Sequence, residues 1–195
     1  MNVEPIVLQG RALRLEPLAA RHAADLARAA EPEVFRYLLD SPAVFGDVAA
    51  TEAYIERQRA GADRVPFAIV DLTSARAVGS TSYMTIRPRH RGLEIGHTWL
   101  ARSAQGTHVN PEAKFLLLRH AFERLGCLRV ELKTDGRNLQ SQRAMTRLGC
   151  VREGVLRRHM VLPDGFVRDT VMFSLLAEEW PGVREQLTAR LGYAP

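Results

Sequence analysis

The chain has 195 residues, of which 46% are hydrophobic and 25% charged, a balance typical of one globular domain over residues 1–195. Its net charge is +5, but 25 of its 27 basic residues are arginines and most are interleaved with acids, which argues against a nucleic-acid-binding surface. The N-terminus lacks a signal-peptide pattern and no apolar run is long enough to span a bilayer, so no membrane is expected and a cytoplasmic protein is predicted.

The first half of the chain alternates between strand and helix patterns. Residues 12–18 show the period of a strand, and residues 18–32 place apolar side chains at helical spacing. A second helix is predicted over 47–61, with Asp47 as its N-cap. Three strands then follow with short connections, which predict antiparallel hairpins: residues 66–72, 77–88 and 92–101.

The second half adds helices and strands in a mixed order. The connection Pro163-Asp164-Gly165 favours a tight reversal between the last two predicted strands. Together with the first half, this order predicts an α/β (α+β) fold, a mixed sheet whose faces are covered by helices. The predicted elements are helices over 110–126, 138–149 and from about Glu178, and strands over 127–135, 151–162 and 166–176.

The two cysteines, Cys127 and Cys150, both lie beside apolar runs and have no histidines at ligand spacing. This pattern indicates neither a disulfide framework nor a zinc site, and no metal is expected. We expect two buried thiols.

A well-marked helix start follows the strand over 92–101. Asn110 can cap the first turn, Pro111 suits the first helical position and Glu112 complements the helix dipole. The free amides from Gly106 to Val109 would then point back toward the end of the strand and bind an anion there. The alternative is an ordinary capped helix, which this stretch alone favours.

A second polar helix start lies at Asn138 and Ser141, whose spacing puts both on one side of the first turn. By itself Asn138 is interpreted as a helix cap. Positive charge gathers at Arg87, Arg89 and His90 and again over 152–159, and these residues are candidate contacts for an acidic ligand such as a phosphorylated cofactor.

Several motifs in order resemble the GNAT acetyltransferases, most closely the RimJ/RimL type that acetylates N-termini of ribosomal proteins. The resemblance covers about residues 11–176 and rests on EIGHTWL, QGTHVN, RVELKTDGRN, Asn138-x-x-Ser141 and LGCVREGVLR. It implies the GNAT fold, with a mostly antiparallel mixed sheet flanked by helices on both faces. It also implies direct transfer of acetyl from acetyl-CoA to a primary amine, here a protein N-terminal α-amine, and a homodimer.

The resemblance also implies where acetyl-CoA binds. Gln105 matches the first position of the family's phosphate loop, but His108 stands where Gly is usual and Asn110 where Gly or Ala is usual. The His108 side chain would crowd the phosphate, point outward or donate a hydrogen bond to it. The implied contacts are Trp99, Leu100 and Ala101 for the pantetheine arm, Gln105, Gly106, Thr107, His108, Val109 and Asn110 for the pyrophosphate, and Asn138 and Ser141 beside them.

Two residues are candidates for proton transfer. The resemblance places Ser141 near the CoA sulfur as a proton donor, and its alternative role is a helix-start hydroxyl. Glu94 is the candidate base, or else a structural hydrogen-bond acceptor, because Leu93, Ile95 and Trp99 are expected on the opposite face of the strand.

His97 is expected to be a core histidine, in line with the apolar face of its strand. The acceptor is expected to enter between residues 18–60 and the last hairpin around His159 to Phe166. Deprotonating an α-amine at neutral pH costs about 1 kcal/mol, against about 4–5 kcal/mol for a lysine, which favours an α-amine where base machinery is weak.

Two alternatives keep part of this interpretation. The same fold would serve an enzyme that acetylates a small-molecule amine. A catalytically degenerate RNA- or ribosome-associated binding module is motivated by the positive charge and the altered loop. Against the second alternative, the chain is 7% aromatic and no aromatic residue lies within the arginine clusters.

Overall fold

The structure, a computed structural model, describes residues 1–193 and contains an eight-stranded sheet in the order β1-β2-β3-β4-β5-β6-β8-β7. β5 and β6 are parallel, and the other neighbouring pairs are antiparallel, which confirms the predicted mixed, mostly antiparallel sheet. The strands are β1 (Leu8–Gln9), β2 (Leu13–Pro17), β3 (Val65–Asp71), β4 (Arg76–Arg87), β5 (Gly92–Leu100), β6 (Arg129–Asp135), β7 (Val151–Val161) and β8 (Val167–Leu176).

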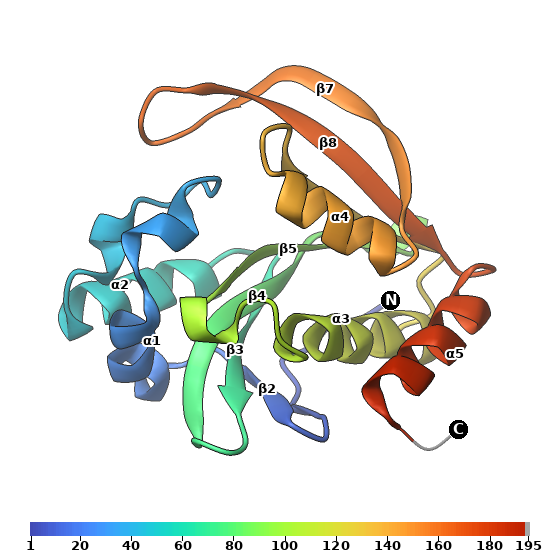
Figure 1. Cartoon of the computed structure of the whole chain (residues 1–195), viewed down its shortest axis with the longest axis horizontal. Coiled ribbons are helices and arrows are strands. Elements are labelled where there is room, and N and C mark those ends of the chain that lie inside the picture. Colours follow the sequence, from blue (N-terminus) through green and yellow to red (C-terminus); the bar gives the residue numbers. More distant parts are fainter. Residues whose placement is uncertain (194–195) are drawn as a thin grey trace.

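Helices cover both faces of this sheet (Figure 1). On β3, Phe67 and Ile69 belong to a core with α3, α4 and α5, whereas Ala68 and Val70 belong to a second core with α1 and α2. Because alternate residues of a strand point to opposite faces, the two cores lie on opposite sides of the sheet. The helices are α1 (Ala23–Ala29), α2 (Val48–Arg59), α3 (Val109–Arg119), α4 (Leu139–Arg147) and α5 (Trp180–Leu191), and none is long and apolar enough to cross a bilayer in the described part of the chain.

Local signals in the sequence are confirmed where they act within a few residues. Asp47 caps α2 by accepting from the Ala50 amide at 2.7 Å, and Asn138 caps α4 by accepting from the Ser141 amide at 3.0 Å. The β7–β8 turn has Gly165 at φ +83°, a conformation that favours glycine. Cys127 and Cys150 are both buried, as predicted, and burial raises their pKa values to about 11 and about 12.

The predicted cap of α3 is wrong by two residues. The helix begins at Val109, and His108 rather than Asn110 occupies the N-cap position. The reason is the hydroxyl of Thr107, which donates to Ala104 O at 2.7 Å and accepts from the Val109 amide at 3.2 Å, so the chain turns into the helix earlier. Asn110 therefore lies inside the first turn.

Glu112 is the acidic residue in the first turn of α3, as predicted, and it has a second role. Its buried carboxylate accepts from the Arg11 amide at 2.5 Å and from the Tyr193 hydroxyl at 2.5 Å. It also accepts from the Ala12 amide at 3.2 Å. Glu112 thus fastens the turn between β1 and β2, and the segment after α5, to the start of α3.

A bulge in β5 overturns the expectation that Trp99 shares a face with Leu93 and Ile95. Ser80 pairs with Trp99 and Ser82 with Gly96, so two residues of β5 stand opposite one residue of β4, and His97 has φ +53°. A bulge shifts the alternation of side chains by one residue. Trp99 consequently joins the core beside α1 and α2.

Candidate active site

The candidate site is a gap between β5 and β6. The two strands pair only from Gly92 to Glu94 of β5, opposite Arg129 to Glu131 of β6, and the rest of both strands forms no rungs with each other. Because the strands are parallel, α3 follows β5 and α4 follows β6 at the same edge of the sheet. Both helices begin on the same side of the view, near the end of β5 (Figure 1). The gap therefore brings together the predicted loop and the predicted start of α4.

The loop before α3 has the donors that an anion needs. The amides of Gly106, Thr107 and His108 donate to no acceptor within residues 1–193, and all three residues are exposed. Free amides at a helix start attract anionic groups, so these residues fit a diphosphate. Gln105 has another task, since its side chain donates to Leu100 O at 3.0 Å and ties the loop to the end of β5.

The histidine in this loop does not distort the backbone. His108 has φ −67° and ψ −16°, which any residue adopts without strain. Its side chain is exposed, and which of the three predicted orientations it takes toward a phosphate stays a prediction. The left-handed position of the loop is Gly106, at φ +74°.

We expect the substitution His108→Gly to change the dissociation constant for acetyl-CoA by less than about twofold, since glycine at an N-cap costs only a few tenths of a kcal/mol. Gly106→Ala is the matched control, because it strains a residue at φ +74° and should weaken binding. Isothermal titration with acetyl-CoA measures both. A tenfold loss in His108→Gly would mean that the imidazole itself contacts the ligand.

At the end of β5, some of the backbone amides and carbonyls already have hydrogen-bond partners. The Ala101 amide donates to Val78 O at 2.8 Å, which places it in the ladder with β4. Leu100 O already accepts from Gln105. Since successive residues of an antiparallel strand point their amides in opposite directions, the Leu100 amide faces away from β4, toward the gap.

Glu94 lies where β5 and β6 separate, and its carboxylate is already paired. It is 3% exposed and accepts from Lys133 Nζ at 2.8 Å and from Thr85 Oγ1 at 3.4 Å. This geometry favours the structural alternative, because a general base would have to compete with the lysine for its own lone pairs. Ser141 lies in the first turn of α4, half-buried, with its amide held by Asn138.

His97 is largely buried, as expected of a core histidine, but its ring contacts polar partners rather than only apolar ones. Its side chain is 9% exposed, with Nε2 2.5 Å from Asp40 Oδ2 and Nδ1 3.3 Å from the Tyr54 hydroxyl. Burial by itself raises the pKa of Asp40, but the hydrogen bond and charge of His97 outweigh it and hold that pKa below its usual value. The pair links β5 to the loop before α2, and sequence reasoning missed Asp40 because it lies in a non-periodic segment.

Lys114 is a second residue that the sequence did not single out. It lies on α3, is 7% exposed, and donates to Thr98 Oγ1 of β5 at 2.7 Å. Burial lowers the pKa of Lys114 to about 8. The available signal was its place among the apolar residues of a helix otherwise rich in leucine.

The two segments predicted to border the acceptor entrance, residues 18–60 and the β7–β8 hairpin, are in contact. The β7–β8 hairpin arches away from the sheet toward the segment before α2 (Figure 1). Arg168 Nη1 donates to Tyr37 O at 3.3 Å, and the guanidinium of Arg137 lies 3.4 Å from the ring centroid of Phe166. The two segments predicted to border the acceptor entrance therefore meet in space, although one lies in the first and the other in the second half of the chain.

The two predicted clusters of positive charge lie in different surroundings. Arg87 is paired with Glu131 at 2.8 Å and is not free for a ligand. Arg157, Arg158 and His159 line an open hollow on the β7–β8 hairpin together with Asp169. These side chains lie on the hairpin that was predicted to border the acceptor entrance, and not on the loop before α3.

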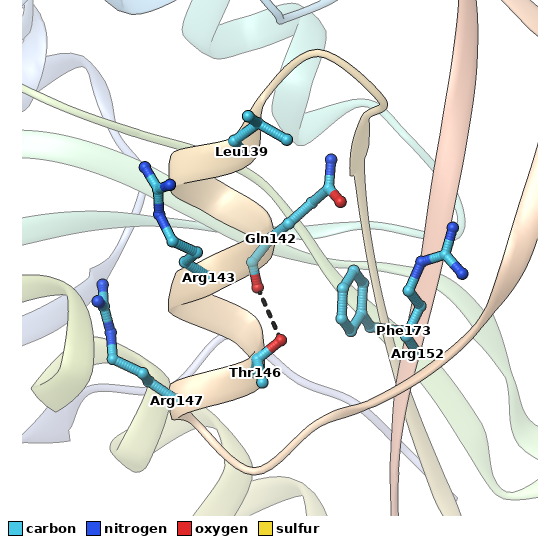
Figure 2. Close-up of a pocket in the computed structure, with 7 residues that line it drawn as sticks. All are labelled: Leu139, Gln142, Arg143, Thr146, Arg147, Arg152 and Phe173. Atoms are coloured by element: carbon cyan, nitrogen blue, oxygen red, sulfur yellow. Dashed lines mark hydrogen bonds between the residues drawn. The ribbon is translucent and has the colours of Figure 1, made fainter.

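Another hollow of about 390 Å³ lies between α4 and the hairpin (Figure 2). Gln142 and Thr146 face Phe173 and Arg152 across it, whereas Arg143 and Arg147 extend from the other side of the helix (Figure 2). Of the residues predicted to contact a ligand, Arg152 from the cluster over 152–159 lines it, whereas the loop before α3, Asn138 and Ser141 do not. Its lining residues are Leu139, Gln142, Arg143, Thr146, Arg147, Arg152 and Phe173.

Comparison with known proteins places this geometry in a family. The family model of the GNAT acetyltransferase domain matches residues 12–151. The crystal structure of a "putative acetyltransferase" from T. thermophilus is 44% identical, with a TM-score of 0.88 over 98% of this chain and 100% of that one. A GCN5-related N-acetyltransferase from Brucella melitensis is 32% identical, with a TM-score of 0.92 over 99% of this chain and 87% of that one.

A curated relative is also similar in sequence. The "Putative ribosomal N-acetyltransferase YdaF" of Bacillus subtilis (strain 168) is 32% identical over 104 residues, which are 53% of this chain. The match spans 56% of that protein, a little more than half of its length. With the family model covering most of the chain, these matches lead to one conclusion. The chain belongs to the GNAT acetyltransferase family.

Proposed function

We propose that this protein is an acetyl-CoA-dependent N-acetyltransferase that transfers acetyl directly to a primary amine, namely a protein N-terminal α-amine. Membership of the GNAT family supports the reaction, and the name of the Bacillus subtilis relative supports a ribosomal-protein acceptor. The observation that carries the proposal is the gap between β5 and β6, which has two helix starts at its open end.

Each side of the gap has a task in this reaction. The free amides of Gly106, Thr107 and His108 bind the diphosphate, and the Leu100 amide holds the pantetheine arm. Acetyl-CoA supplies an acyl group activated as a thioester. The Ser141 hydroxyl, at the start of α4, donates a proton at the sulfur.

An α-amine fits the base machinery of this site. Glu94 is engaged by Lys133, so the site has little capacity to take a proton from a strongly basic amine. Deprotonating an α-amine at neutral pH costs only about 1 kcal/mol, whereas a lysine side chain costs about 4–5 kcal/mol. The acceptor should therefore be an amine whose own pKa is low enough for it to lose its proton readily at neutral pH.

A two-part experiment tests the proposal. Thermal shift with acetyl-CoA tests binding. Release of the CoA thiol tests turnover with three kinds of acceptor: peptides with a free N-terminus, Nα-acetylated peptides that carry one lysine, and small amines. We expect stabilisation, and faster release with peptides that have a free N-terminus than with Nα-acetylated peptides that carry one lysine. No stabilisation at millimolar acetyl-CoA would refute the cofactor assignment. Turnover with polyamines or other small amines, and none with peptides, would reassign the acceptor.

Ser141→Ala should lower kcat by about 10- to 100-fold, at or below the lower end of the range for losing a general acid, because a thiolate is already a good leaving group. Acetyl-CoA affinity should stay nearly unchanged, since the Ser141 amide and not its hydroxyl bonds the cap residue Asn138. Thr146→Ala is the control, because it removes another hydroxyl of α4 that bonds only Gln142 O. Steady-state kinetics decide the question, and an unchanged kcat would remove Ser141 from the reaction.

A further inference from the structure

We propose that the ammonium group of Lys114 faces the sulfur site in the gap between β5 and β6 and stabilises the thiolate of CoA as it leaves. This inference rests on the proposed function and adds a residue that the family resemblance did not supply. In the transfer, the amine nitrogen forms a bond to the acyl carbon and loses a proton to solvent, and the C–S bond breaks. The electron pair of that bond stays on sulfur, where the negative charge must be held until Ser141 delivers a proton, which solvent replaces on its hydroxyl.

The first observation is that lysine is rare in this chain and confined to this site. Only two of the 27 basic residues are lysines, Lys114 and Lys133. Both point at β5, since Lys114 Nζ lies 2.7 Å from Thr98 Oγ1 and Lys133 Nζ lies 2.8 Å from Glu94 Oε2. Lysine differs from arginine in being a compact point charge whose proton affinity responds to its surroundings.

The second observation is that the charge of Lys114 is not balanced. Lys133 forms an ion pair with Glu94, but no carboxylate lies within 4.0 Å of Lys114 Nζ in the described part of the chain. Thr98, a neutral hydroxyl, is its only hydrogen-bond partner within residues 1–193. An ammonium has three donors, so two remain without an acceptor on a side chain that is 7% exposed. Buried donors of this kind normally have a partner, which points to a ligand.

The third observation is the position of Thr98. It follows the bulge at His97 and lies in the part of β5 that does not pair with β6. Thr98 is half-buried, so the residue that binds the ammonium still reaches solvent in this unpaired part of β5. That hydroxyl is itself held by Thr81 at 2.7 Å, which keeps the lysine from moving toward β4.

The charges around Lys114 leave it cationic at neutral pH. Burial lowers the pKa of Lys114 to about 8, and Glu94 on β5 acts against this effect, whereas the nearby Cys150 thiol, between α4 and β7, has a pKa of about 12 and is uncharged near neutral pH. Glu94 is itself neutralised by Lys133 from β6. A cation in such a poorly solvated place interacts strongly with a new negative charge nearby.

The test measures the thiol of bound CoA by its thiolate absorbance as a function of pH, with protein in excess. A free thiol has a pKa of about 8.5. We expect bound CoA to contain at least tenfold more thiolate at pH 7 than free CoA, and Lys114→Met to abolish that enrichment. The protein's own thiols do not interfere near neutral pH, because burial raises the pKa values of Cys127 and Cys150 to about 11 and about 12. Lys114→Arg, which keeps a cation, should retain part of the enrichment.

A second readout uses the unmodified protein and so survives a variant that fails to fold. Protein labelled with ¹⁵N at the lysine side chains gives signals from Lys114 and Lys133 alone, and Lys133→Arg assigns them. The Lys114 signal should move with CoA and much less with desulfo-CoA, which lacks the sulfur.

Three results decide between the hypotheses. Equal shifts with CoA and desulfo-CoA, or equal thiolate content in the parent protein and Lys114→Met when both bind CoA, would overturn the role of Lys114 and leave the proposed function intact. Failure of the parent protein to bind CoA at all would overturn both.

Discussion

Replacing Trp99 with alanine is expected to lower the free energy of unfolding by about 3–5 kcal/mol, the usual cost of deleting a buried aromatic side chain. Trp99 is 3% exposed, and its ring centroid lies 5.2 Å from that of Phe35 and 5.0 Å from that of Phe45. Both phenylalanines lie in short helical turns before α2, so this cluster fastens that segment to β5. Urea unfolding of the two proteins measures the difference.

The same substitution should affect the acceptor more than acetyl-CoA. The segment held by Trp99 carries Asp40, which contacts His97 of β5. The KM for the acceptor should therefore rise more than the dissociation constant for acetyl-CoA, because the Trp99 ring packs on the segment that carries Asp40, whereas the implied contact of Trp99 with the pantetheine arm is through its backbone. Trp99→Phe keeps a ring in the cluster and is the matched control, with a smaller loss on both measures. A loss below about 1 kcal/mol in Trp99→Ala would contradict the role of the cluster.

The free energy of unfolding of the Lys114→Met variant should fall, relative to that of the parent protein, by about 2–3 kcal/mol as pH rises from 7 to 10. The pKa of Lys114 is lowered from 10.5 to about 8 in the folded protein, so the unfolded chain binds the proton more tightly. Below pH 8 the whole of this destabilising contribution from Lys114 is present in the parent protein. It is lost as pH rises from about 8 to 10.5. Methionine does not titrate, so the difference between the two proteins isolates this one group.

Urea unfolding at several pH values between 7 and 10 measures that difference. Other groups that titrate in this range are present in both proteins and cancel in the subtraction. A difference that stays constant with pH would mean that Lys114 keeps an ordinary pKa and is not desolvated. The expected result also has a functional meaning, since a buried, unbalanced cation lowers the stability of the protein and is explained by a ligand that needs its charge.

Much of the fold was predictable because its signals act over a few residues. Asp47 and Asn138 cap their own helices, and Pro163-Asp164-Gly165 reverses its own hairpin. Such contacts depend on side chain and backbone within one turn, and tertiary packing rarely changes them. The cap of α3 failed for the same local reason, because the hydroxyl of Thr107 competes with Asn110 and acts first.

The candidate site was predictable in outline and not in its polar contacts. The order of elements and the family resemblance led to the loop at Gly106 and to the start of α4. They did not predict the pairing of Glu94 with Lys133. In that pair the candidate base already accepts a hydrogen bond from the lysine. Strand alternation also failed at His97, because nothing in the residues themselves marks a bulge there.

Periodicity, caps and turns in the chain were therefore enough to predict most of the helices and strands and their order, since each depends on neighbours in sequence. The prediction that the loop before α3 binds an anion needed the family resemblance as well. Tertiary packing decided which side chains meet in the gap. Asp40 reaches His97, and Lys114 reaches Thr98, only after the sheet is assembled and β5 separates from β6. The physical reason is that burial and charge pairing depend on groups distant in sequence, and these interactions set the proton affinities on which the chemistry depends.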